Sequence, residues 1–98
     1  MYLLQGKLTA KHGKREELAE ILKDASKLIA KSEGSKFYIV GKCAEDENDV
    51  YVTELWNSKE DHDNSLNYPG VKELIMKAMP ILDGQPEKGK EIQVLSEI

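Results

Sequence analysis

One junction in this 98-residue chain gathers residue types that are suited to acid–base chemistry. A strand pattern ends at Trp56, the chain's only tryptophan, and one of the two histidines, His62, follows six residues later. Because the pKa of imidazole lies near neutrality, His62 is the natural candidate for a general base. We predict a site here with His62 and Trp56 as catalytic residues and with polar or aromatic substrate contacts nearby, namely Tyr38, Tyr51, Asn64, Ser65 and Tyr68.

Each of these residues also has a structural interpretation. Trp56 could be a core residue at a strand end, and His62 lies between two aspartates, where it could be solvated. Tyrosines pack in cores more often than they react, and Asn64 and Ser65 could line the end of a short helix. Glu54 is interpreted as structural unless it faces the pocket unpaired. A cavity that holds both His62 and Trp56 would favour an enzyme, whereas a filled core would favour a binding protein.

Composition disfavours several other classes of function. The net charge is −4 with acidic and basic residues interspersed, so no basic face predicts nucleic-acid or membrane binding. Cys43 is the single cysteine, which predicts neither a disulfide nor a cysteine metal site. No paired histidines or glycine-rich nucleotide loop are present, and no apolar run approaches the ~18 residues of a membrane span. We expect a soluble cytoplasmic protein without a metal.

Apolar spacing predicts the elements that position the site. Period-two patterns indicate strands over residues 2–9, 37–43, 50–56 and 91–95, and period-3.6 patterns indicate a helix over 14–31 and two more after Trp56. Gly34 is the expected cap of the first helix, and Ser58 is the expected N-cap of the second, which stalls near Asn67. Pro69 can start the third helix, which carries Leu74, Ile75, Ala78 and Met79, and Pro80 should stop it.

This order of elements predicts one α+β domain over residues 1–98. It is the ferredoxin-like split βαβ order, in which an antiparallel four-stranded sheet carries its helices on one face. The strands nevertheless place apolar residues on both faces, for example Leu3 beside Leu4 and Phe37 beside Tyr38. The uncovered face therefore predicts a two-fold homodimer, a dimeric α+β barrel, with an extended arm over residues 83–90 reaching the partner.

The chain resembles the antibiotic biosynthesis monooxygenase family over essentially its whole length. In that family a strand, a Lys-x-Gly-Lys turn and an amphipathic helix precede a Glu-Gly turn, and a later strand ends in Glu-x-Trp-x-Ser-x-Glu. The corresponding segments here are Lys11-His-Gly13-Lys14, Glu33-Gly34 and Glu54-Leu-Trp56-Asn-Ser58-Lys-Glu60.

The resemblance implies oxygenation of a quinol-like or polyphenol-like aromatic by dioxygen, without metal, flavin or haem. Such a protein contributes a dry pocket, a base and hydrogen-bond donors to the substrate oxyanion. On this interpretation His62 is the base and Trp56 is the wall against which a flat substrate packs, while tyrosine or asparagine side chains bind its oxygens.

At three positions this chain lacks residues that branches of the family carry, and these differences bear on which function it has. Many members carry a histidine where this chain has Ser65, and the isomerases of the same fold rely on it. The haem-degrading branch carries asparagine, tryptophan and histidine where this chain has Gly6, Ser65 and Ile75, so haem cleavage is disfavoured. The alternatives are a same-fold isomerase or other enzyme, and a non-catalytic ligand-binding or structural dimer.

Overall fold

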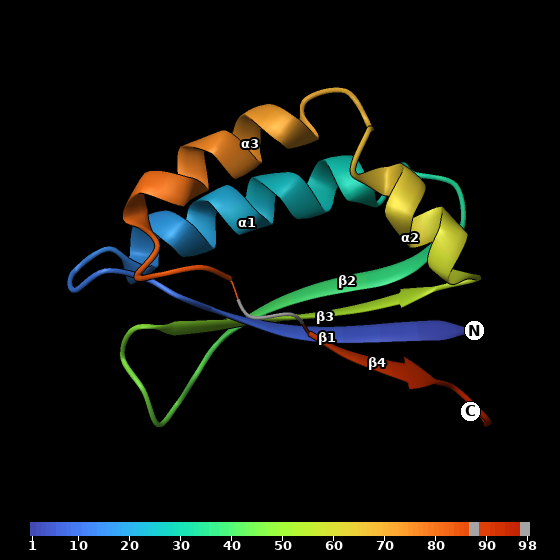
Figure 1. Cartoon of the computed structure of the whole chain (residues 1–98), viewed down its shortest axis with the longest axis horizontal. Helices are drawn as coiled ribbons and strands as arrows, with labels where there is room; N and C mark the ends of the chain where they lie inside the picture. The colour runs from blue at the N-terminus through green and yellow to red at the C-terminus, as the bar shows by residue number, and fades with distance from the viewer. Residues whose placement is uncertain (87–88, 97–98) are drawn as a thin grey trace.

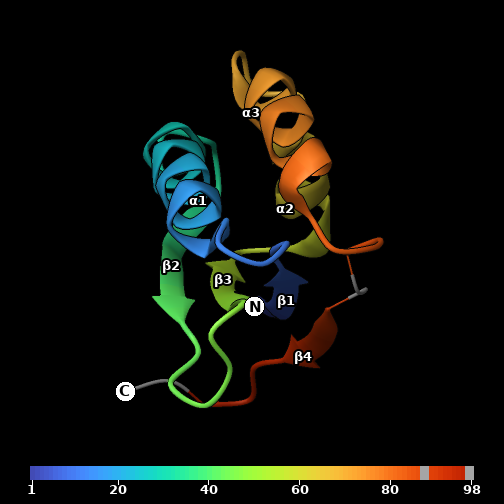
Figure 2. The same ribbon diagram turned by 90° about the vertical axis from the view of Figure 1, so that its left-hand side faces the viewer.

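A four-stranded antiparallel sheet carries the helices on one face, as the computed structural model shows for residues 1–86 and 89–96 (Figures 1 and 2). The strands lie in the order β2-β3-β1-β4, which confirms the predicted ferredoxin-like α+β fold. None of the helices described is long and apolar enough to cross a membrane. The elements in chain order are β1 (Tyr2–Thr9), α1 (Arg15–Ile29), β2 (Ser35–Lys42), β3 (Asp49–Trp56), α2 (Lys59–Ser65), α3 (Val71–Ala78), the 3₁₀ turn η1 (Met79–Ile81) and β4 (Lys90–Gln93).

The core lies between the sheet and the helix layer. The apolar stripe predicted for the first helix is the buried face of α1, where Leu18 and Leu22 pack with Val50 and Val52 of β3. A second cluster surrounds Trp56 at the end of the sheet beside α2. Figure 2 shows that α1 lies above β2, whereas α2 and α3 lie above the side of the sheet near β1.

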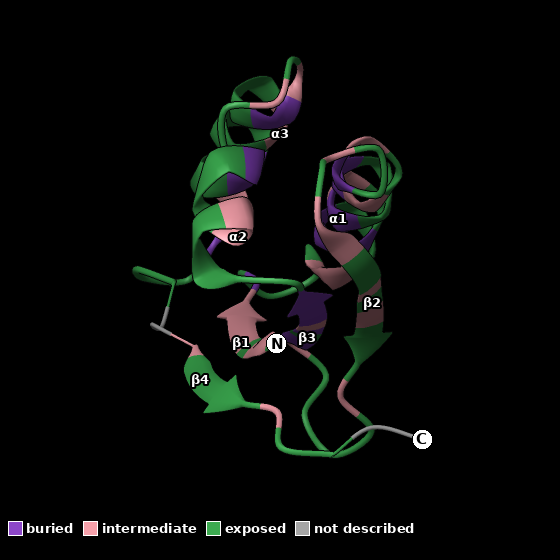
Figure 3. Ribbon diagram, turned by 90° about the vertical axis from the view of Figure 1, so that its right-hand side faces the viewer, coloured by how far each residue is buried: buried purple, intermediate pink, exposed green. Residues whose placement is uncertain are grey.

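The other sheet face carries none of the described helices (Figure 3), and a row of apolar residues crosses it. Strand register aligns four residues across the whole sheet, because Leu55 pairs with both Phe37 and Leu3, and Leu3 also pairs with Ile92. Phe37 is 37% exposed and Ile92 is 43% exposed. We call Phe37, Leu55, Leu3 and Ile92 the outer row.

The turn between α1 and β2 differs from the prediction. The helix ends at Ile29 with Ala30 as its cap, so the prediction that Gly34 caps it was wrong. Gly34 instead has a φ of 83° in the turn before β2, and a side chain there would collide with the Asp61 carboxylate. Position 34 requires glycine, because its backbone is left-handed and Asp61 of α2 lies too close for a side chain.

The start of α3 differs from the prediction, whereas the start of α2 and the end of α3 agree with it. Ser58 is the N-cap of α2, and its Oγ accepts a hydrogen bond from the Asp61 amide at 3.1 Å, as predicted. The third helix does not begin at Pro69, because Gly70, with a φ of 94°, is its N-cap. Pro80 lies in η1, where α3 ends as expected. The strand predicted over residues 91–95 spans 90–93, and residues 87–88 of the predicted arm lie outside the described residues.

Candidate active site

A cavity of about 330 Å³ lies between the helix layer and the sheet. Its wall is mainly apolar, with contributions from β1, α1 and α3 that include Leu4, Gly6, Leu22, Ala25, Val71 and Leu74. Among the described residues, four polar or ionisable side chains interrupt this wall: Tyr38, Glu54, His62 and Ser65. An apolar cavity with a few convergent polar groups is typical of small-molecule sites.

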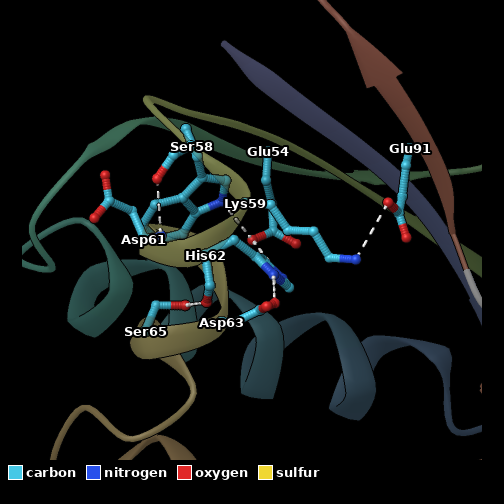
Figure 4. A network of polar contacts seen from close by, with 9 residues as sticks. Glu54, Ser58, Lys59, Asp61, His62, Asp63, Ser65 and Glu91 are labelled. Atoms are coloured by element: carbon cyan, nitrogen blue, oxygen red, sulfur yellow. Dashed lines mark hydrogen bonds and ion pairs between the residues drawn. The ribbon is translucent and has the colours of Figure 1, made fainter.

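His62 lies on α2 with each ring nitrogen near a carboxylate (Figure 4). Its Nδ1 is 3.0 Å from Oδ1 of Asp63, and its Nε2 is 3.9 Å from Oε1 of Glu54. The ionised, half-exposed Asp63 can only accept a hydrogen bond, so it favours the tautomer with the proton on Nδ1. The lone pair of Nε2 is then available on the side of Glu54 and the cavity.

Ser65 supports His62 from one turn further along α2. The Ser65 hydroxyl donates a hydrogen bond to the His62 carbonyl oxygen, and Ser65 is only 1% exposed. Ser65 therefore lines the cavity while it ties down the last turn of this short helix.

Glu54, which the sequence interpretation took as structural unless it faced the pocket, lines the cavity and is a functional candidate. It is 8% exposed, and its Oε1 accepts a hydrogen bond from Trp56 Nε1 at 3.1 Å. Burial raises the pKa of Glu54, although the hydrogen bond from Trp56 and the charge of His62 act in the opposite direction. The available signal was its position, a carboxylate between Val52 and Trp56 on the buried face of β3.

Trp56 lies in the core and is not among the residues that line the cavity. It is fully buried against Ala25, Ile29 and Val71, a placement that agrees with its structural interpretation. Its ring meets the His62 ring edge-on, with centroids 5.9 Å apart. The cavity thus holds His62 but not Trp56.

Tyr2 is a residue that the sequence interpretation left out. Strand register pairs it with Trp56, and its ring centroid lies 5.7 Å from that of His62. Partial burial raises the pKa of Tyr2, and the nearby carboxylates, Glu91 first, add to this effect. Tyr2 begins β1, far from His62 in the sequence, and only the pairing of β1 with β3 brings it close to α2.

The predicted substrate contacts divide into two groups. Tyr38 lines the cavity, as Ser65 does, and burial followed by the charge of Glu54 raises the pKa of its phenol. Three others lie elsewhere: Tyr51 is 38% exposed on the outer sheet face, Asn64 is exposed, and Tyr68 packs against the Trp56 cluster.

The three positions that distinguish the haem-degrading branch, here Gly6, Ser65 and Ile75, all line the cavity. Their side chains include no nitrogen ligand for iron. Within the described residues, no group of three His, Cys, Asp or Glu side chains is arranged to hold a metal ion.

Comparison with known proteins gives both a family and a fold. The family model described as antibiotic biosynthesis monooxygenase matches residues 1–76. No curated protein sequence matches the chain. A crystal structure from Chloroflexus aurantiacus, of a protein assigned to the antibiotic biosynthesis monooxygenases, is 28% identical with a TM-score of 0.87, covering 99% of this chain and 95% of that one.

Two more distant structures share the fold. A protein from Nitrosomonas europaea with the same assignment is 14% identical with a TM-score of 0.90, covering 98% of this chain and 100% of its own. A variant of SnoaB, a cofactor-independent oxygenase from Streptomyces nogalater, is 12% identical with a TM-score of 0.82, covering 99% of this chain and 95% of its own.

Proposed function

The chain belongs to the antibiotic biosynthesis monooxygenase family, and from this premise we propose that it oxidises a phenol or quinol with dioxygen, without metal, flavin or haem. In this reaction the deprotonated, electron-rich substrate itself reduces dioxygen. The protein must then supply a base, a water-poor pocket and donors for the oxyanion.

The single observation that carries the proposal is the placement of His62 Nε2 at an apolar cavity. The cavity volume of about 330 Å³ is in the range of small-molecule sites and accommodates a small aromatic ring system. Its apolar wall favours a flat aromatic, while its few polar groups orient the reacting oxygen. His62 is 14% exposed, so the base works with little competing water.

Tyr38 and Asp63 support the assignment of His62 as the base. Asp63 Oδ1, 3.0 Å from Nδ1, favours the tautomer that leaves Nε2 as a proton acceptor and stabilises the imidazolium that forms. The Tyr38 phenol is protonated at neutral pH, and burial raises its pKa further, so it acts as a hydrogen-bond donor to a substrate oxyanion. Trp56 then has a positioning role, since it binds Glu54 and contacts the His62 ring edge-on.

The experiment is an isotope-labelling assay on chelator-treated protein. Purified protein is screened with phenols, naphthols, anthrones and quinols by oxygen electrode, and positive reactions are repeated under ¹⁸O₂. The proposal predicts one ¹⁸O atom in the organic product and the other in water. Absence of oxygen uptake across the panel, together with tight binding of the same aromatics, would favour a ligand-binding protein instead. Activity that returns only when a metal or flavin is added would contradict the cofactor-free chemistry.

A further inference from the structure

Burial of the Glu54 carboxyl in the cavity wall should destabilise the folded protein. Glu54 is 8% exposed in a mainly apolar wall, and the basic side chain beside it is that of His62, whose Nε2 lies 3.9 Å from Oε1. Taking a carboxylate out of water destabilises a protein unless the charge is paired or neutralised. The Trp56 indole needs a hydrogen-bond acceptor, but a neutral glutamine would serve equally well. The acid itself therefore calls for an explanation.

The distance between Glu54 and His62 fits a substrate oxygen between them. Oε1 of Glu54 is 3.9 Å from Nε2 of His62, beyond the range of a direct hydrogen bond. An oxygen atom at about 2.8 Å from each would complete a triangle with both groups. Both side chains line the cavity, so a bound molecule reaches this position from the apolar side.

Few other ionisable groups face this pair. Among the described residues, Tyr2 faces it from β1, Tyr38 from β2, and Asp63 from α2. Glu91 of β4 lies on the same sheet face, because Leu4 pairs with both Glu54 and Glu91, and its carboxylate pairs with Lys59 of α2 at 3.6 Å. The cavity-lining residues of α1 and α3 are apolar, among them Ile21, Leu22, Leu74 and Ile75. Burial consequently raises the pKa of Glu54, which lets the carboxyl keep a proton at a pH where an exposed glutamate has lost it.

We propose that Glu54 is a second catalytic residue, a general acid that protonates the departing peroxide oxygen while His62 acts as the base. Two groups are needed at that step because one proton must leave carbon as another reaches oxygen. This inference rests on the proposed oxygenase function.

The first half of the reaction forms the peroxide. His62 takes the phenolic proton, and the phenolate transfers one electron to dioxygen. The two radicals join through a new carbon–oxygen bond at a ring carbon that still bears hydrogen. The peroxide anion then takes the proton back from the imidazolium.

The second half uses both residues at once. His62 removes the proton from that carbon, the electron pair of the C–H bond forms the carbonyl, and the O–O bond breaks. Glu54 gives its proton to the departing oxygen, which leaves as water. The imidazolium returns a proton to Glu54, so one phenol and one dioxygen have become one quinone and one water.

The test compares Glu54→Gln with Glu60→Gln, a control at an exposed residue of α2. Glutamine keeps an oxygen acceptor for Trp56 Nε1 but cannot donate an acid proton. We expect quinone formation to fall by ~100-fold and the hydroperoxide to accumulate, with oxygen uptake less affected and Glu60→Gln unchanged.

The outcomes separate this inference from the proposed function. Wild-type quinone formation in Glu54→Gln would overturn the role of Glu54 and leave the oxygenase intact. Equal loss of oxygen uptake and quinone formation without hydroperoxide would also overturn the acid role. If the wild type consumes no oxygen with any phenol, the proposed function fails and the acid step fails with it.

Discussion

The Trp56 indole nitrogen donates a hydrogen bond to the Glu54 carboxylate two residues earlier on the same face of β3, at 3.1 Å. Residues at this spacing point to the same side of a strand, so the two side chains meet without a bend in the chain. The fully buried Trp56 thus fixes a carboxyl that lines the cavity. The Glu-x-Trp pattern is one structural unit that joins the core to the candidate site.

Removing the indole donor should destabilise the fold as well as the site. Trp56→Phe is expected to lower the free energy of unfolding by about 2–4 kcal/mol, because Glu54 loses its donor and the smaller ring leaves a void. Urea denaturation measures this cost. In a Glu54→Leu background the same substitution should cost ~1 kcal/mol less, since the hydrogen bond is already gone. Equal costs in both backgrounds would show that the bond contributes nothing.

The pH dependence of stability should reveal the buried carboxyl. Because the pKa of Glu54 is raised above its ordinary value of 4.5, the folded state binds more protons than the unfolded state between these two pKa values. Wild-type stability should therefore fall relative to Glu54→Gln as pH rises from 4.5 through the raised pKa. Urea titrations from pH 4 to 8 at one protein concentration measure the difference. If the wild type instead became more stable than Glu54→Gln as the pH rises, the raised pKa of Glu54 would be contradicted.

Local patterns in the sequence predicted most of the fold. The β1 strand and the Ser58 cap follow from period-two spacing and side-chain capping, which act between near neighbours. The helix limits at Ile29 and Val71 were missed, because Gly34 and Gly70 adopt left-handed turns in response to packing between helices. Contacts between helices that are distant in the sequence are difficult to predict from a single sequence.

The candidate site was predicted less well than the fold. His62, Tyr38 and Ser65 do line one cavity, whereas Trp56 lies in the core. Spacing places a residue on a face but does not tell whether neighbouring side chains fill the space in front of it. For the same reason the sequence left open whether Glu54 is structural or faces the pocket.

Gly6 should set the size of the substrate that the cavity accepts. Of the described residues, only the Gly89 backbone comes within 4.0 Å of a Cβ built on Gly6, so a larger side chain would extend into the cavity without disturbing the strand. We expect Gly6→Val to fold, since valine suits a strand, and to bind a tricyclic phenol about tenfold more weakly, ~1.4 kcal/mol. Fluorescence titration measures this change.

Gly41→Val is the matched control for Gly6→Val. A Cβ at Gly41 meets nothing within 4 Å, and Gly41 does not line the cavity. Unchanged affinity in Gly41→Val and reduced affinity in Gly6→Val would support the assignment. Equal affinity in both variants would place the bound phenol elsewhere.

We propose that the outer row forms the interface of a homodimer. Phe37, Leu55, Leu3 and Ile92 cross all four strands in register, and burying such a row against a second copy removes apolar surface from water. Sedimentation equilibrium at micromolar concentration should give twice the 11.1 kDa chain mass.

The control for this interface lies on the helix layer. Leu3→Lys should produce a folded monomer, whereas Met76→Lys, at a residue of α3 that is 72% exposed, should stay dimeric. A wild-type monomer under these conditions would contradict the interface, and so would loss of the dimer in Met76→Lys alone.

The most direct test of the account is the oxygen-uptake rate of His62→Ala between pH 6 and 8, with a phenol identified in the screen. Loss of the general base should lower kcat by ~100-fold or more and leave the dissociation constant of the phenol nearly unchanged. His12→Ala, at the other histidine, which is exposed, should behave as wild type. A His62→Ala protein with wild-type turnover across this pH range would contradict the assignment of His62 as the base.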